Sequence, residues 1–309
     1  MSNKKLLQNA VVVFLTASFC CALWGSAFPF VKIGYSLFGI TSGAINSQIL
    51  FAGMRYTIAG ILTLAVGSIL SKKILVPATG NWMKIINLSL FQTIIQYVFF
   101  YIGISNTTGV KSSIVVGSNA LVSLLVASLF FHQEKLTTQK IIGCVIGFAG
   151  VIVVNLNKSG MGGSFKLTGE GFIFLSTVSY AIASVLLKKY AKYENVLTLN
   201  AYQFLIGGVA MMTAGFVSGG KLVNYTGASI SILLYLGFLS SVTYCLWGML
   251  LKYNPVSKVS VYGFMTPVFG VWLSAWLLKE NKFIGYQCII ALLLVCVGIY
   301  IVNYNKPAE

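Results

Sequence analysis

The chain has very few acidic side chains. Its 309 residues include no aspartate, five glutamates and a single histidine, His132. A carboxylate-rich metal centre, phosphotransfer to an aspartate and a His–Asp catalytic triad therefore lack their parts. The six cysteines all lie inside apolar runs and none has the spacing of metal ligands. We expect no metal site, no cofactor and no enzymatic activity that pairs a nucleophile with a base.

Charge of either sign is also scarce. Charged residues make up 8% of the chain, against roughly 25% in soluble domains, whereas hydrophobic residues make up 57%. Such a chain cannot face water all round, so most of it must face lipid. The formal net charge of +16 does not indicate nucleic-acid binding, because the lysines stand singly or in pairs between apolar runs, as residues that flank membrane spans do.

The apolar residues are grouped into runs of membrane-crossing length. A bilayer core about 30 Å thick requires about 20 apolar residues per helix, and inside hydrocarbon such a run satisfies its backbone as a helix. The breaks between the runs are short and polar, too short to fold as soluble domains. The predicted fold class is an all-α integral membrane protein with ten transmembrane helices, over residues 10–32, 46–70, 84–104, 111–131, 140–157, 170–189, 198–218, 229–250, 258–278 and 284–303.

The lysines also predict an orientation. Lys4 and Lys5 precede the first run as in a signal peptide, but the run continues without a small-residue cleavage site, so we expect a retained first span. An even number of spans puts both termini on one side of the membrane. Most lysines then fall in loops on the side of the termini, which predicts a multi-pass protein of the cell membrane with both termini cytoplasmic.

The second half of the chain resembles the first. Glu134 is followed by a glycine-to-asparagine segment at 150–155, and Glu280 is followed by a similar segment at 298–303. Each half holds five predicted spans, and an odd number forces the two halves to insert with opposite orientation. We therefore predict two inverted five-helix repeats, residues 10–157 and 170–303, with a cavity between them.

Several short motifs follow one another along nearly the whole chain. They are Leu23-Trp24-Gly25-Ser26 with Lys32, Arg55-Tyr56, Glu134-Lys135-Leu136-Thr137, and Pro267 thirteen residues before Glu280. In this order the chain resembles the EamA-type transporters of the drug/metabolite transporter (DMT) superfamily, as two tandem EamA-like units. One departure is Leu121, which stands where such families often carry the proline that corresponds to Pro267.

The resemblance implies a transporter that moves a small metabolite through a central cavity by alternating access. We expect export of an amino acid or a related metabolite; the alternative is a flippase of the same fold for a lipid or lipid-linked substrate, with a cavity that opens sideways to lipid. The implied partners are a small-molecule substrate and membrane lipids, with no nucleic acid, and the protein is a monomer or a homodimer. A channel would need repeated polar rings along its path, and the sequence contains none.

Arg55 is the one charge deep inside a predicted span. It lies about nine residues from the start of its run, roughly 13 Å deep at 1.5 Å per residue. A charge at that depth costs several kcal/mol unless it faces a cavity or a partner, and no acid lies inside a span to pair with it. Arg55 either receives a substrate carboxylate or phosphate, or it caps carbonyl groups and fixes helix packing.

Uncharged polar and aromatic residues complete the candidate site. Gln92 and Gln96 stand four residues apart and share a helix face, and amides beside aromatics suit a partly apolar ligand. The alternative is that such residues form hydrogen bonds between helices or interfacial aromatic belts. The candidate substrate-binding residues are Trp24, Arg55, Gln92, Gln96, Asn119, Tyr180, Tyr244, Trp247 and Tyr262.

Two prolines and the missing acids bear on the mechanism. Pro29 and Pro267 interrupt helical hydrogen bonding, so each is a candidate hinge or a static kink. Since the glutamates fall at helix ends or in loops, we expect transport without a carboxylate relay inside the membrane, by facilitated diffusion or exchange. Gly143, Gly147 and Gly150 form a small-residue face that favours tight helix packing.

Overall fold

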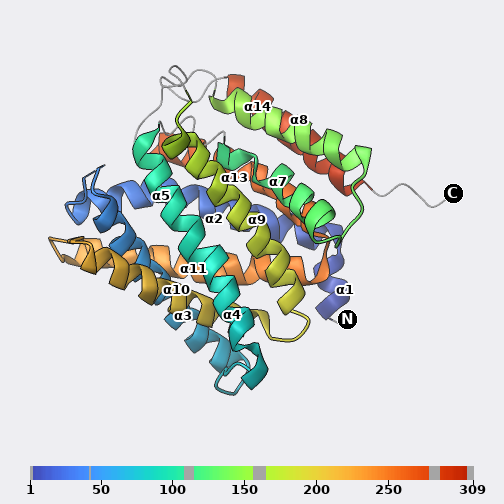
Figure 1. Ribbon diagram of the computed structural model, residues 1–309. Helices are drawn as coiled ribbons and strands as arrows, with labels where there is room; N and C mark the ends of the chain where they lie inside the picture. The colour runs from blue at the N-terminus through green and yellow to red at the C-terminus, as the bar shows by residue number, and fades with distance from the viewer. Residues whose placement is uncertain (1–2, 42, 108–114, 156–164, 278–285, 305–309) are drawn as a thin grey trace.

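The computed structural model describes residues 3–41, 43–107, 115–155, 165–277 and 286–304, and these residues form helices with no strand among them (Figure 1). Many large apolar side chains point outward, and Ile69, Phe216 and Ile289 are each more than 60% exposed. Bare apolar surface of this extent is what lipid covers, and it agrees with the predicted all-α integral membrane protein.

Among the described residues, six stretches are long and apolar enough to cross a membrane. Proline and glycine inside them do not end them; for example, α2 continues past Pro29. The six are α2 (Ala10–Leu37), α3 (Ile45–Leu70), the stretch Thr79–Ile104, the stretch Leu167–Tyr190, α10 (Val196–Val217) and α11 (Gly227–Tyr253). The third comprises η1 (Thr79–Asn81), α4 (Trp82–Ser89), the π-helical turn η2 (Leu90–Ile95) and most of α5 (Gln96–Asn106), and the fourth joins η4 (Leu167–Gly171) to α9 (Phe172–Tyr190).

The other four predicted spans coincide with shorter or broken helices. They border residues 108–114, 156–164 and 278–285, which lie outside the described part of the chain, so the count of ten spans stays a prediction. These helices are α7 (Asn119–Leu125) with η3 (Val126–Phe130), α8 (Thr138–Asn155), α12 (Val256–Ser260) with η5 (Val261–Phe264) and α13 (Met265–Leu277), and α14 (Tyr286–Asn303). A short helix, α1 (Asn3–Gln8), precedes α2.

Corresponding helices of the two halves make corresponding contacts. α2 packs against α11 and α13, and α9 packs against the corresponding helices of the first half, α5 and α7. The two most extensive contacts join α3 to α10 and α8 to α14, and Figure 1 shows α8 and α14 side by side.

Glycines set the distance between these paired helices. A Cβ on Gly53 would lie 2.3 Å from the backbone nitrogen of Met212, and one on Gly298 would lie 2.6 Å from the carbonyl oxygen of Gly143. Both distances are far shorter than van der Waals contact, so only glycine fits. Small residues of this kind let helix backbones approach closely in membranes. The contact of Gly298 with Gly143 and Gly147 confirms the packing role predicted for that glycine face.

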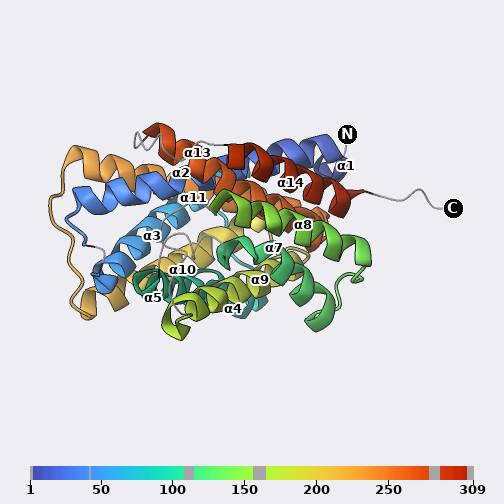
Figure 2. The same cartoon turned by 90° about the horizontal axis from the view of Figure 1, so that it is seen from above.

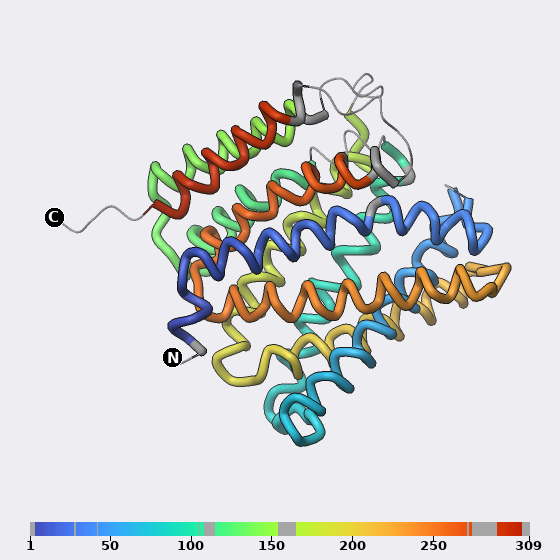
Figure 3. Tube along the Cα trace, turned by 180° about the vertical axis from the view of Figure 1, so that it is seen from behind, coloured from blue at the N-terminus to red at the C-terminus, as the bar shows by residue number. Residues whose placement is uncertain are grey.

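The two ends of the bundle differ. α1 and the last turn of α14 lie at one end, here called the N-terminal end, while the α2–α3 and α10–α11 connections lie at the other (Figures 2 and 3). At the N-terminal end Gln8 donates to the carbonyl of Tyr253 (3.0 Å) and Asn254 donates to the carbonyl of Leu7 (2.9 Å). At the opposite end the backbone N–H of Val223 donates to the carbonyl of Phe38 (3.1 Å), so both ends are tied by contacts between the halves.

Candidate functional site

Arg55 lies inside the bundle on α3, with 6% of its surface exposed. Its Nε donates a hydrogen bond to the hydroxyl of Ser240 on α11 (3.0 Å), and Ser240 in turn donates to the carbonyl of Leu236 (2.9 Å). The guanidinium carbon lies 5.3 Å from the centre of the Tyr56 ring, which is within range of a cation–π interaction. Ser240 and the neighbouring ring thus hold the charge in one place.

The terminal nitrogens of Arg55 remain available. Among the described residues Ser240 is the single hydrogen-bond partner of the guanidinium, and no carboxylate in that part of the chain lies within 4.0 Å of it. A buried charge without a counter-ion is costly unless it pairs with something. The position therefore suits an anionic group supplied from outside the protein.

A chain of aromatic rings surrounds this arginine. Tyr56 stacks on Phe204 of α10 with ring centres 5.3 Å apart, and Phe204 meets the edge of Tyr244 of α11 at 5.1 Å. The Tyr244 hydroxyl is hydrogen-bonded to that of Tyr97 (2.8 Å). We call this group the aromatic cluster; its members are Trp24, Tyr56, Tyr97, Tyr101, Phe204, Tyr244 and Trp247.

The cluster joins five helices that are far apart in sequence. Trp24 of α2 contacts two rings of α11: its ring centre lies 5.6 Å from that of Tyr244 and 4.9 Å from that of Trp247. On the other side Tyr97 of α5 lies 4.7 Å from Tyr56. Arg55 adjoins this group of rings at Tyr56.

A π-helical turn positions the polar residues that precede Tyr97. Such a turn leaves backbone groups without their usual helical partners, and here the carbonyl of Phe91 accepts a hydrogen bond from Ser179 of α9 (2.6 Å). Thr93 donates to Gln203 of α10 (2.6 Å). The turn η2 therefore fastens this stretch to both neighbouring helices and carries Gln92, with Gln96 directly after it.

Four of the predicted residues have buried polar atoms that lack a hydrogen-bond partner among the described residues. They are Oε1 of Gln92, Oε1 of Gln96, Oδ1 of Asn119 and Nε1 of Trp247. A buried donor or acceptor left unpaired costs about 1–3 kcal/mol, so such atoms mark places where water or a ligand binds.

The structure brings part of the predicted site together. Trp24, Tyr244 and Trp247 meet in the aromatic cluster, and Arg55 lies beside the ring of its member Tyr56. Tyr180 lies on α9, near Tyr97 and Tyr244.

The remaining predicted residues lie elsewhere. Tyr262 of η5 packs against Phe14, with ring centres 6.2 Å apart, outside the cluster. Asn119 begins α7, and within the described residues no hydrogen bond or ring contact joins it to the cluster. A role for these two residues in binding stays a prediction.

Ser240 is the functional candidate that sequence reasoning missed. The signal for it is a run of hydroxyl residues inside an apolar span, Ser240, Ser241 and Thr243 on α11. Serine and threonine hydroxyls inside a helix commonly donate to a carbonyl of the same helix. The sequence alone therefore does not show which of these three hydroxyls contacts Arg55. Ser240 differs from the other two because it lies at the same depth as Arg55 of α3 and accepts its hydrogen bond.

The two candidate hinges occupy different settings. Pro29 lies in the interior of α2, where the carbonyl of Gly25 loses its helical hydrogen bond, and Gly25 packs directly on Gly270 of α13. Pro267 lies in the first turn of α13, just after η5, where a helix does not need its N–H. The helix break in the second half thus precedes Pro267 rather than following from it.

The glutamates in the connections are tied to neighbouring groups. Glu134 accepts hydrogen bonds from Lys140 (2.6 Å) and from the backbone N–H (3.0 Å) and hydroxyl of Ser257. Burial raises the pKa of Glu134, but these bonds outweigh it and lower the pKa below its usual value. Glu194 accepts from Asn81 (2.9 Å) and from the N–H of Ala78 (3.0 Å); its partial burial raises its pKa, and the bonds again lower it on balance. Both carboxylates are therefore occupied as structural anions.

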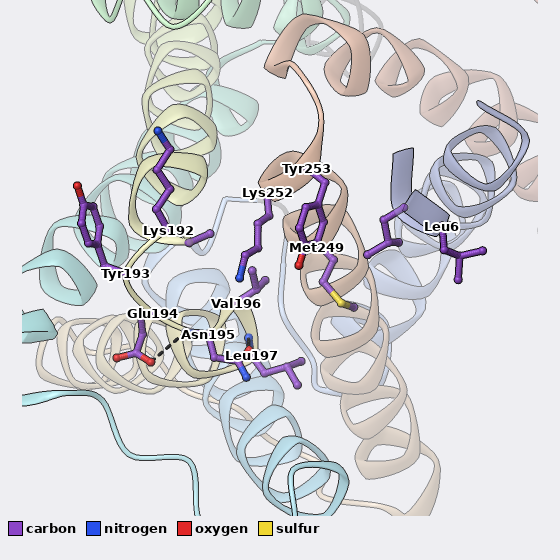
Figure 4. A pocket seen from close by; sticks show the side chains of 12 residues that line it. Leu6, Lys192, Tyr193, Glu194, Asn195, Val196, Leu197, Met249, Lys252 and Tyr253 are labelled. Atoms are coloured by element: carbon purple, nitrogen blue, oxygen red, sulfur yellow. Dashed lines mark hydrogen bonds between the residues drawn. The ribbon is translucent and has the colours of Figure 1, made fainter. Parts of the chain in front are cut away.

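A pocket of about 700 Å³ opens at the N-terminal end, away from the aromatic cluster (Figure 4). It is formed by α1, the α9–α10 connection and the end of α11, and none of the predicted substrate-binding residues lines it. In the described part of the chain no group of three or more His, Cys, Asp or Glu residues could hold a metal ion.

Comparison with known proteins identifies the fold and the family. The model of the EamA-like transporter family matches residues 9–156 and again residues 167–304. A solved crystal structure superimposes on this chain with a TM-score of 0.76 at 18% identity, over 96% of this chain and 97% of that one, which shows a shared fold.

Curated relatives are similar over nearly their full length. The chain is 27% identical over 298 residues to an uncharacterized transporter, YvbV, of Bacillus subtilis (strain 168), covering 96% of this chain and 92% of the relative. It is 28% identical over 304 residues to an uncharacterized transporter of Archaeoglobus fulgidus, covering 96% and 99%. These names give no substrate.

Proposed function

Since the chain belongs to the EamA-like transporter family, within the drug/metabolite transporter superfamily, we propose that it exports a small anionic or zwitterionic metabolite, of the amino-acid class, across the cell membrane. The substrate would occupy a central cavity beside the aromatic cluster and cross by alternating access. The observation that carries the proposal is Arg55, a buried cation whose terminal nitrogens lack a partner among the described residues.

Two inverted five-helix units, residues 10–157 and 170–303, would enclose this cavity. The packing pattern supports them, because each half contributes a helix that packs in the same way against the other half. The first helix of one half, α2, packs on α11 and α13, and its counterpart in the other half, α9, packs on α5 and α7. The two separate matches to one family model support the same division. Related units in opposite orientation form the architecture of many transporters that alternate between two open states.

The chemistry of the site favours a substrate with an anionic group and an apolar body. Arg55 would pair with the carboxylate, because a planar guanidinium can form a bidentate hydrogen-bonded contact with such a group. Tyr56, Tyr244 and Trp24 would cover the apolar part, and their electron-rich faces would accept a substrate ammonium. The unpaired side-chain oxygens of Gln92 and Gln96 would accept further hydrogen bonds.

Movement and driving force follow from the same residues. Pro29 would let α2 bend beside the cluster, with Pro267 in the first turn of α13 as its counterpart. No glutamate of the described residues lies in the middle of a span: Glu170 is in the first helical turn, where it accepts from Thr107 (2.8 Å). We therefore propose facilitated diffusion or exchange; concentrative uptake driven by an imposed pH gradient alone would contradict this.

The proposal is tested by transport in reconstituted vesicles. A metabolite library is first screened for ligands that raise the thermal stability of the purified protein, since a ligand at 100 times its dissociation constant adds about 2.7 kcal/mol. Efflux of a labelled hit is then compared between wild type, Arg55→Lys and Arg55→Gln. We expect Arg55→Gln to lose most transport and Arg55→Lys to retain part of it. Full transport by Arg55→Gln at equal expression would remove this residue from the site.

A second comparison distinguishes the substrate class. Amino acids are tested beside their amides, which lack the carboxylate, and beside labelled phospholipids. Preference for the acid over the amide supports the role of Arg55. Movement of phospholipid without movement of any amino acid would replace the proposal by the flippase alternative.

A further inference from the structure

The pocket at the N-terminal end combines charge with an apolar wall. Lys252 reaches from α11 toward the connection between α9 and α10, and Lys192 stands on the opposite rim (Figure 4). The walls between them come from Leu6 of α1, Leu197 of α10 and Met249 of α11. A purely polar solute would leave these walls uncovered.

The cations of this pocket are not neutralised by the protein. Neither the ammonium group of Lys192 nor that of Lys252 forms a hydrogen bond or salt bridge within the described chain; the Lys252 ammonium has only a distant contact with the ring of Tyr253 (5.7 Å). The nearby carboxylate, Glu194, is already occupied, because it accepts from Asn81, from the N–H of Ala78 and from the N–H of Asn195. The Tyr253 hydroxyl also makes no hydrogen bond within the described chain, so it can donate to a ligand.

The pocket lies where the apolar helices end. It opens beside the start of α2 and of α10, both long enough to cross a membrane, and Val11 on α2 is 63% exposed. Since helices of this length cross the hydrocarbon core, we expect their ends to lie near the level at which lipid headgroups meet the acyl chains. A ligand that fits the pocket at that level has an anionic headgroup that contacts Lys252 and Tyr253 and a hydrocarbon chain that packs against Leu6 and Leu197.

We propose that this pocket binds one anionic phospholipid of the adjoining leaflet, with the phosphate at Lys252 and the Tyr253 hydroxyl and an acyl chain along Leu6, Leu197 and Met249. The lipid would join α1, the α9–α10 connection and the end of α11 into one surface. It is a bound lipid rather than the transported substrate, and it occupies a different site from Arg55, so the proposal stands or falls independently of the transport function.

Native mass spectrometry of the full-length protein in detergent tests this directly. Phosphatidylglycerol and phosphatidylcholine with identical acyl chains are titrated, and the preference for the anionic lipid is compared between wild type, Lys252→Gln and the Lys192→Gln/Lys252→Gln double variant. A lysine near an anionic lipid contributes enough to change the affinity about fivefold, so we expect a loss of about fivefold for the single variant and about 25-fold for the double. The matched control is Lys73→Gln, an exposed lysine of the α3–α4 connection outside the pocket.

Two further arms identify the ligand. Inorganic phosphate and glycerophosphoglycerol, which lack acyl chains, should not displace the lipid, and Leu6→Ser should weaken the binding of phosphatidylglycerol. Displacement of the lipid by inorganic phosphate at similar concentration would mean a soluble-anion site and would overturn the proposal. An unchanged lipid preference in Lys252→Gln, or an equal loss in Lys73→Gln, would overturn it as well.

Discussion

At the residue scale, the behaviour of Arg55 depends on what faces it. A guanidinium in the interior of a membrane protein must be solvated by dipoles, by a counter-ion or by water. Here one hydroxyl, Ser240, and the face of Tyr56 provide part of that solvation, and the rest is left open. The protein thus holds the cation in position without neutralising it, which is the arrangement an anion-binding residue requires.

The hydroxyl of Ser240 should therefore contribute to stability. Replacement by alanine leaves the Nε of Arg55 without a partner, and we expect Ser240→Ala to lower the free energy of unfolding by about 2 kcal/mol, as for a lost hydrogen bond to a charged group. Thermal unfolding in detergent measures it. The control is Ser231→Ala on the same helix, whose exposed hydroxyl bonds to the carbonyl of Gly227 (2.7 Å) and to nothing else. Equal effects of the two variants would contradict the role given to Ser240.

Glu134 makes stability depend on pH. Its bonds to Lys140 and Ser257 lower its pKa in the folded state relative to the unfolded value of about 4.3. The stabilisation is therefore complete above about pH 5 and is lost as the pH falls through the folded-state pKa. We expect the melting temperature of wild type to fall more steeply between pH 5 and pH 3 than that of Glu134→Gln. Parallel curves for the two proteins would show that this carboxylate does not carry the effect.

At the element scale, hydrogen bonds and glycines decide how the helices meet. The π-helical turn η2 puts one extra residue into a turn, and Ser179 compensates by bonding to the carbonyl of Phe91. The α3–α10 contact is set by glycine on both sides, since a Cβ on Gly208 would lie 2.5 Å from the backbone nitrogen of Thr57. Because α3 carries Tyr56 beside Arg55 and α10 carries Phe204, this close contact also brings Tyr56 and Phe204 together.

A single added methyl group should disturb this contact. Gly53→Ala would place its Cβ 2.3 Å from the backbone of Met212, so the helices must move apart, and we expect a loss of about 1–3 kcal/mol in the free energy of unfolding. Gly80→Ala is the control, because a Cβ on Gly80 meets nothing within 4 Å. The two variants are compared by thermal unfolding at equal protein concentration; similar melting temperatures would mean that the helices can separate without cost.

At the scale of the whole molecule, the arrangement of the ends constrains the topology. α1 and the end of α14 lie together, and the α10–α11 connection lies at the opposite end (Figure 3). Lys73 belongs to the α3–α4 connection, which hydrogen bonds from Ala78 and Asn81 join to Glu194 at the N-terminal end, whereas Lys221 belongs to the α10–α11 connection at the opposite end. In a membrane these two positions should be on opposite sides, with the N-terminal end in the cytoplasm under the proposed orientation.

Cysteine labelling tests this orientation. A membrane-impermeant maleimide should modify Lys221→Cys in intact cells and Lys73→Cys only after permeabilisation, with the wild-type chain as control for its native cysteines. Modification of both variants from the same side would contradict the five predicted crossings between these two positions, and with them the inverted repeats. Modification of Lys73→Cys alone in intact cells would reverse the orientation.

Much of the fold follows from the sequence because membrane-crossing helices are specified locally. The runs at 46–70 and 198–218 became α3 and α10 with nearly the predicted bounds, and the family predicted from short motifs is confirmed. The candidate site was harder to predict. The depth of Arg55 marked it in sequence, but its partner Ser240 is 185 residues away and resembles every other serine in an apolar helix.

The amino-acid sequence by itself determined the membrane environment, the helices and the isolated buried cation, because each depends on composition and on runs of about 20 residues. Only the tertiary structure decided which residues surround that cation, where the π-helical turn falls and which lysines at the N-terminal end remain unpaired. These features depend on contacts between helices that meet at glycines and single hydroxyls, and the pattern of apolar residues along a span does not record which face meets which neighbour.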